Sequence, residues 1–223
     1  MKKALICLLS IFIVTGALAV SHTASQGVSP DDALKMLLDG NKRFVSNEAQ
    51  HPHQSIEQRV RTAKEGQKPF ATILTCSDSR VPPEIFFDAG IGYIFVIRVA
   101  GNVVDKDALG SIEYAADHLG SSLIMVVGHT KCGAIAAVVN NDHVGGNITS
   151  VTDKIRPAVE KTRAANKGLA GDALILESTK ANVRQSMEEI TRSSGDIKGL
   201  VNAGKVKIVG AIYDVETGSV NVL

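Results

Sequence analysis

Short runs of apolar residues, many of them β-branched, recur along this chain and alternate with longer stretches of helical periodicity. The apolar runs cover residues 70–74, 93–97, 123–127 and 206–213, with a brief run at 220–222. Runs that are apolar at nearly every position are typical of strands buried on both faces of a sheet. Apolar residues at helical spacing cover residues 30–45, 55–65, 108–119, 132–140, 150–165, 173–193 and 195–203.

This alternation predicts an α/β fold with a central, mainly parallel β-sheet flanked by helices. Residues 206–213 and 220–222 are separated by a Glu-Thr-Gly turn, which favours a C-terminal antiparallel hairpin. The length of 223 residues suits one domain with a sizeable core.

Composition excludes several classes of function. Hydrophobic residues make up 44% of the chain and charged residues 21%, a globular balance that argues against global disorder. Lys and Arg number 24 against 23 acidic residues, so the chain lacks the positive field that nucleic-acid or anionic-lipid binding requires. The sequence also lacks a phosphate-binding loop and a G-x-G-x-x-G turn, which disfavours a nucleotide enzyme.

The first residues have the pattern of a secretory signal peptide. Met1-Lys2-Lys3 is basic, residues 4–14 are apolar, and Ala17-Leu18-Ala19 supplies small residues for cleavage. We therefore expect a signal peptide at 1–19, with cleavage as late as residue 24 as an alternative, followed by a single domain at 20–223. We therefore expect an exported mature protein, and the periplasm is its expected location. An uncleaved membrane anchor is the alternative.

Potential metal ligands follow two of the predicted strands. Cys76 comes after the first strand, and His129 and Cys132 come after the third. Because the carboxyl ends of parallel strands share one edge of a sheet, these side chains can converge. Two thiolates and an imidazole suit Zn²⁺, and three protein ligands leave one position free, as in catalytic zinc sites. A disulfide between Cys76 and Cys132 is the alternative.

Asp78 and Arg80 lie in the same loop as Cys76. Their spacing allows a bidentate carboxylate–guanidinium pair. The alternative is an Asp that caps a turn beside a solvated Arg.

These motifs together resemble the β-class carbonic anhydrases. Cys-Ser-Asp-Ser-Arg at 76–80 and Gly-His-Thr-Lys-Cys-Gly at 128–133 carry the resemblance, which extends from about Gln67 to Ala136. It implies reversible hydration of CO2 to bicarbonate and a proton by a zinc-bound hydroxide. It also implies that the zinc is held by Cys76, His129 and Cys132. Asp78, held by Arg80, would accept the hydrogen bond of the hydroxide and would bind zinc only in a closed state.

The resemblance also assigns a substrate pocket. It implies that the amide of Gln67 lies near the substrate and that Phe95, Ala100 and Tyr114 line an apolar pocket. In the family a residue like Tyr114 reaches that pocket from a partner subunit, which implies a homodimer or homotetramer.

Two other functions remain open at this point. The same scaffold could hydrolyse COS or CS2, which are linear like CO2. A non-catalytic bicarbonate- or zinc-binding relative is the second alternative, although none of Asp78, Arg80 or the three ligands is missing.

Overall fold

The computed structural model describes residues 27–223, so the predicted signal peptide at 1–19 lies outside the described residues. Within them, the strands form one sheet in the order β2-β1-β3-β4-β5. The neighbours β2, β1, β3 and β4 pair in parallel, and β5 pairs antiparallel with β4. The mainly parallel sheet and the C-terminal hairpin confirm the predicted fold class. The strands are β1 (Ala71–Thr75), β2 (Ile94–Arg98), β3 (Leu123–His129), β4 (Lys207–Tyr213) and β5 (Val220–Val222).

The helices follow the predicted stretches closely, with boundaries set by local caps. The N-cap residues Ser29, Ser55 and Asp105 each accept a hydrogen bond from a backbone N–H in the first turn, which satisfies a donor that the helix leaves unpaired. The helices are α1 (Pro30–Val45), α2 (Ile56–Glu65), α3 (Pro83–Phe86), α4 (Lys106–Glu113), α5 (Gly133–Asn140), α6 (Thr149–Ala165), α7 (Gly171–Ser193) and α8 (Gly195–Asn202).

Two local features differ from the sequence prediction. The short helix α3 was not predicted, because its four residues are too few to show periodicity. The helix predicted at 108–119 begins earlier, after the Asp105 cap, and its last turn at Tyr114–His118 is π-helical.

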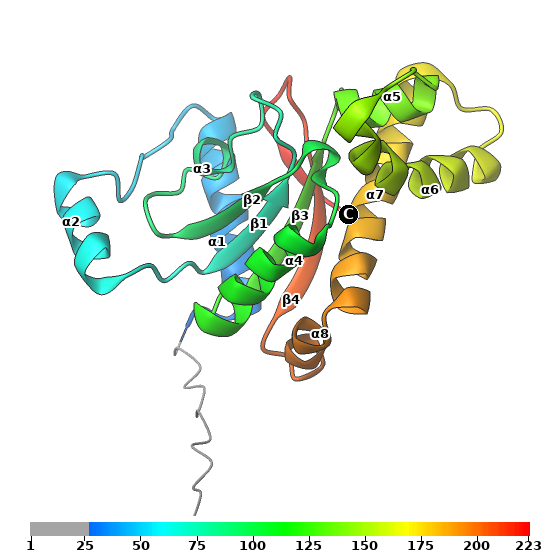
Figure 1. The fold of residues 1–223 in the computed structure, drawn as a ribbon. Helices are drawn as coiled ribbons and strands as arrows, with labels where there is room; N and C mark the ends of the chain where they lie inside the picture. Colours follow the sequence, from blue (N-terminus) through cyan, green and yellow to red (C-terminus); the bar gives the residue numbers. More distant parts are fainter. Residues whose placement is uncertain (1–26) are drawn as a thin grey trace, which may run out of the picture.

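Helices cover both faces of the sheet (Figure 1). Helix α1 lies behind the sheet in that view, and the core on this side includes Leu37, Phe86 and Met125. On the opposite face α4, α7 and α8 contribute Ile112, Ile190 and other apolar side chains to a second core. No described helix combines the length and the apolar character that a membrane crossing needs.

A third group of apolar side chains lies beyond the carboxyl ends of the strands. There α5, α6 and the first part of α7 pack together beside the sheet (Figure 1). Ile135 and Ile155 are fully buried in this group, which also includes Cys76 and Cys132. The candidate ligands therefore lie in a packed, largely apolar environment at the carboxyl ends of the strands.

Candidate metal centre

Cys76, His129 and Cys132 converge as the sequence predicts. Their sulfur and ring nitrogen atoms all lie within 4.8 Å of one another, and all three residues are buried. Cys76 directly follows β1, His129 is the last residue of β3, and Cys132 is the N-cap of α5. Both cysteines are free thiols, so the alternative of a disulfide is wrong for this structure.

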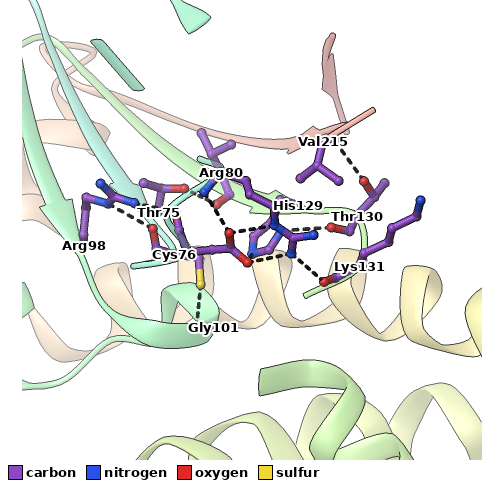
Figure 2. A network of polar contacts seen from close by, with 11 residues as sticks. Thr75, Cys76, Arg80, Arg98, Gly101, His129, Thr130, Lys131 and Val215 are labelled. Atoms are coloured by element: carbon purple, nitrogen blue, oxygen red, sulfur yellow. Dashed lines mark hydrogen bonds and ion pairs between the residues drawn. The ribbon is translucent and has the colours of Figure 1, made fainter. Parts of the chain in front are cut away.

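The imidazole of His129 is oriented by a backbone carbonyl. Its Nδ1–H donates to the carbonyl oxygen of Thr130 at 2.9 Å, as Figure 2 shows. Thr130 is itself held, because its Oγ1 accepts from the N–H of Val215 at 3.0 Å. Nε2 of His129 is left buried, with no hydrogen-bond partner among the described residues. A buried imidazole lone pair beside two thiols fits a zinc ion, whose histidine ligands typically have the other ring nitrogen hydrogen-bonded.

The two thiols change each other's acidity in opposite directions. The thiol of Cys132, together with the N–H of Gly101, lowers the pKa of Cys76 against the opposing effect of burial. The interaction with the Cys76 thiolate, together with burial, raises the pKa of Cys132 above its usual value. Cysteine binds a metal as the thiolate, so a bound cation would displace the protons that the two sulfurs hold.

Asp78 and Arg80 form the bidentate pair that their spacing predicts. Nε of Arg80 donates to Oδ1 of Asp78 at 2.9 Å and Nη2 donates to Oδ2 at 2.7 Å. The backbone N–H of Arg80 adds a third bond to Oδ1 at 2.9 Å, and Nη2 also reaches the carbonyl oxygen of Lys131 at 3.2 Å. The guanidinium of Arg80 holds the pKa of Asp78 well below its usual range. The carboxylate stays ionised with Oδ2 only 3.9 Å from Nε2 of His129.

Two further residues support the site and were not predicted as site residues. Arg98, at the end of β2, donates to the carbonyl oxygens of Cys76 at 3.1 Å and Asp78 at 2.6 Å. The N–H of Gly101 donates to Sγ of Cys76 at 3.2 Å (Figure 2). The signal available in the sequence for Arg98 is its place at the carboxyl end of an adjacent parallel strand.

Three of the four predicted pocket residues lie apart from the candidate metal ligands within this chain. Gln67 is exposed and precedes β1, whereas Cys76 follows it, so about 16 Å of strand separates the two ends. Phe95 pairs with Thr72, about 10 Å before the end of β2. The ring of Phe95 lies 6.1 Å from that of Tyr114, which is 47% exposed. Ala100 differs from these three residues, because it adjoins Gly101, whose N–H contacts Sγ of Cys76. The assignment of a substrate pocket stays a prediction.

Comparison with known proteins agrees with this geometry. A family model described as carbonic anhydrase matches residues 71–220. Carbonic anhydrase 2 of Mycobacterium tuberculosis is 39% identical over 194 residues, which cover 85% of this chain and 91% of that relative. The carbonic anhydrase of Mycolicibacterium smegmatis is 37% identical over 196 residues, with coverage of 86% and 92%.

Solved structures show the same fold. A Coccomyxa β-carbonic anhydrase in complex with acetazolamide superposes with a TM-score of 0.69 at 27% identity, covering 85% of this chain and 86% of that one. The β-carbonic anhydrase CafA of Aspergillus fumigatus superposes with a TM-score of 0.70 at 26% identity, with coverage of 86% and 91%. The chain therefore belongs to the carbonic anhydrase family and, by its fold, to the β class of that family.

Proposed function

We propose that this carbonic anhydrase hydrates CO2 reversibly to bicarbonate and a proton at a zinc ion held by Cys76, His129 and Cys132. The observation that carries the proposal is the buried cluster of two thiols and one unpartnered imidazole nitrogen, with an ionised carboxylate beside it. A zinc ion in this cluster would supply a hydroxide nucleophile near neutral pH, as zinc does in α-class carbonic anhydrase, where it lowers the pKa of water to about 7.

Asp78 is the residue that would orient the nucleophile. An ionised carboxylate only accepts hydrogen bonds, so Oδ2 can hold the O–H of a hydroxide and direct the oxygen lone pair toward CO2. Arg80 keeps the carboxylate ionised, and its two parallel hydrogen bonds hold both carboxylate oxygens in a fixed orientation. If this pair were broken, Asp78 could turn toward a bound cation, and this would be the closed state of the site.

The pocket for CO2 is, in this proposal, completed by a second copy of the chain. Gln67, Phe95 and Tyr114 cannot reach the metal ligands of their own chain, because they lie toward the other end of the sheet or on its flank. In a homodimer or homotetramer they would line the site of the partner. The amide of Gln67 would then hydrogen-bond a substrate oxygen, and the two rings and Ala100 would give CO2 an apolar surface.

Export to the periplasm is also part of the proposal. It is supported by the basic, apolar and small-residue pattern of residues 1–19. Mass spectrometry of the mature protein should show an N-terminus between residues 20 and 25, and an intact Met1 in the envelope fraction would contradict cleavage.

The test combines metal analysis with stopped-flow CO2 hydration. The wild type should contain one zinc per chain and be active, and Cys132→Ala should lose both the zinc and the activity. His143→Ala, which removes an exposed histidine outside the cluster, is the control and should keep both. A zinc-free but active wild type would contradict the metal site. Turnover of COS or CS2 with no turnover of CO2, or zinc binding without any turnover, would favour the two alternative functions.

A further inference from the structure

The N–H that contacts Cys76 comes from an unusual backbone bend at residues 100–102, here called the Gly101 bend. Gly101 has φ 66° and ψ 17°, and Asn102 follows with φ 46°, so two successive residues are left-handed. A side chain at Gly101 would have its Cβ 2.7 Å from Cδ1 of Ile155 and 3.3 Å from Cβ of Ala134. Glycine thus allows the bend both by its conformation and by its small size. The bend directs the N–H of Gly101 at Sγ of Cys76, 3.2 Å away.

The carbonyl groups of the same bend are held by helix α7. Nδ2 of Asn182 donates to the carbonyl oxygen of Gly101 at 2.8 Å, and Oγ of Ser186 donates to that of Asn102 at 3.0 Å. Asn182 is completely buried and Ser186 is 3% exposed. These two side chains lie one turn apart on α7 and more than 80 residues from the bend in sequence. Both hydrogen bonds are therefore tertiary contacts made away from solvent.

Helix α7 also contacts the strand that carries His129. Gly128 has no side chain where α7 crosses β3, and a Cβ there would lie 2.7 Å from Cγ2 of Val183 and 2.9 Å from Cγ2 of Thr179. Helix α7 therefore packs against Gly128, the residue before His129. Its polar side chains hold the backbone bend that contacts Cys76.

We propose that Asn182 is a positioning residue for the metal centre. Its amide holds the carbonyl oxygen of Gly101, and this limits rotation about the backbone bonds of Gly101 that would take the N–H of the same residue off the sulfur of Cys76. The role rests on the zinc site proposed above, and Asn182 itself touches neither the ligand sulfurs nor the nitrogen of His129.

The expected effect follows from the charge on the sulfur. An N–H that donates to a thiolate stabilises its negative charge and lowers the energy of the sulfur lone pairs. Without the amide of Asn182, the buried carbonyl oxygen of Gly101 loses its partner, and rotation about the backbone bonds of Gly101 can turn its N–H away from Cys76. Outer-shell partners of this kind typically change metal affinity by about 10- to 100-fold.

The experiment compares Asn182→Ala with Ser178→Ala in the full chain. Ser178 lies one turn before Asn182 on α7, is fully buried, and its hydroxyl has no hydrogen-bond partner among the described residues. Zinc affinity is measured by competition with a chelator, and cobalt(II) is used as a spectroscopic probe of the thiolates. Asn182→Ala should bind zinc about 10- to 100-fold more weakly than the wild type. Its thiolate-to-cobalt charge-transfer band should move to longer wavelength, and Ser178→Ala should match the wild type in both measurements.

A second variant covers the case in which Asn182→Ala does not fold. Ser186→Ala removes the hydroxyl from the carbonyl of Asn102 and should shift affinity and spectrum in the same direction, by less, because it acts one peptide further from the sulfur. Folded Asn182→Ala or Ser186→Ala with wild-type affinity and spectrum would overturn the proposal, as would an equal loss in Ser178→Ala. Failure of the wild type to bind zinc would instead overturn the zinc site, and the positioning role with it.

Discussion

At the scale of single residues, the loop from Cys76 to Arg80 is held by hydrogen bonds from three directions. Arg98 holds the carbonyl oxygens of Cys76 and Asp78, the Gly101 N–H holds the sulfur, and Arg80 holds the carboxylate. A loop held in this way keeps its side chains in place before substrate arrives, and this lowers the entropy cost of reaching the reactive arrangement.

Removal of the Arg80 guanidinium should uncouple metal binding from turnover. Arg80→Ala keeps all three ligands, so zinc content should stay near one per chain. Asp78 loses its bidentate partner and can then coordinate the cation at the position that the hydroxide needs. CO2 hydration should therefore fall by about 100-fold or more, the cost typical of a misplaced reacting group. Metal analysis and stopped-flow assays on the same preparation check this.

The matched control for this variant is Arg192→Ala. That residue also pairs with a carboxylate, Glu189, but its side chain is 74% exposed on α7. The control should retain wild-type activity. Near-normal turnover in Arg80→Ala would remove Arg80 from the mechanism.

At the scale of secondary-structure elements, close contacts between helices and strands decide where the ligands lie. Helix α7 packs against β3 only because Gly128 leaves space for Val183 and Thr179. Asn41 on α1 likewise ties the C-terminal hairpin to the fold, since its Nδ2 donates to the carbonyl of Gly218 at 2.8 Å and its Oδ1 accepts from Val220 at 2.8 Å. These contacts fix the layers on both sides of the sheet.

Gly128→Ala should separate α7 from β3. The added methyl group would overlap Val183 and Thr179, and overpacking of a core typically costs about 1–3 kcal/mol of unfolding free energy. Gly110→Ala is the matched control, because nothing lies within 4 Å of its Cβ position and it lies inside helix α4. The control should gain about 0.5–1 kcal/mol, since alanine is the better helix former. Urea unfolding of both proteins checks the opposite signs.

The carboxylate of Asp88 connects helix α1 to the loop that follows it. Its side chain is fully buried, and it accepts hydrogen bonds from Nε of Arg43 at 2.7 Å and from the N–H groups of Gln50 and His51 at 3.0 and 2.8 Å. Burial alone would raise the pKa of Asp88, but the donors from Gln50, Arg43 and His51 together lower it.

Asp88→Asn should therefore lose stability in a pH-dependent way. A lowered pKa stabilises the fold above the unfolded value of about 3.9, and this contribution is lost as the pH falls toward the folded value. The variant should be about 1–3 kcal/mol less stable at pH 7, because one donor is left unpaired in the interior. The difference from the wild type should shrink below about pH 4 in urea unfolding curves. A constant difference down to pH 3 would show that the charge of Asp88 contributes nothing.

At the scale of the whole molecule, the metal ligands and the predicted pocket residues lie in different parts of one chain. Cys76, His129 and Cys132 meet beyond the carboxyl ends of the strands. Gln67 precedes β1, at the opposite end of the sheet from the ligands, and Tyr114 is exposed to solvent. In the proposed assembly, at least two copies of the chain would bring both groups to one pocket.

Mixing of two defective chains tests this assembly. One chain carries Cys132→Ala, and the other carries Gln67→Ala with Tyr114→Ala. After joint unfolding and refolding, mixed oligomers contain sites with intact ligands from one chain and intact pocket residues from the other. CO2 hydration should exceed that of either chain refolded alone, and light scattering should show a mass of at least two chains. A monomeric mass, or no gain on mixing, would contradict a shared pocket.

Several features could be predicted from the sequence alone because their signals are local. Continuous apolar runs identified the four longer strands, and Ser29 carries a side chain that caps α1 directly. The convergence of Cys76, His129 and Cys132 could be predicted because residues at the ends of parallel strands share an edge in any sheet of this kind. The Asp78–Arg80 pair lies within three consecutive residues, so chain geometry alone brings the two groups together.

Only the tertiary structure decided the contacts that join distant parts of the chain. The left-handed Gly101 bend, its attachment to Asn182 and the passage of α7 over Gly128 each depend on elements more than 50 residues apart. The separation of Gln67 and Tyr114 from the ligands depends likewise on which end of which strand each residue occupies. Periodicity reports which face of an element is buried but not what covers it, because many partners can bury the same face. Packing in three dimensions selects one of them.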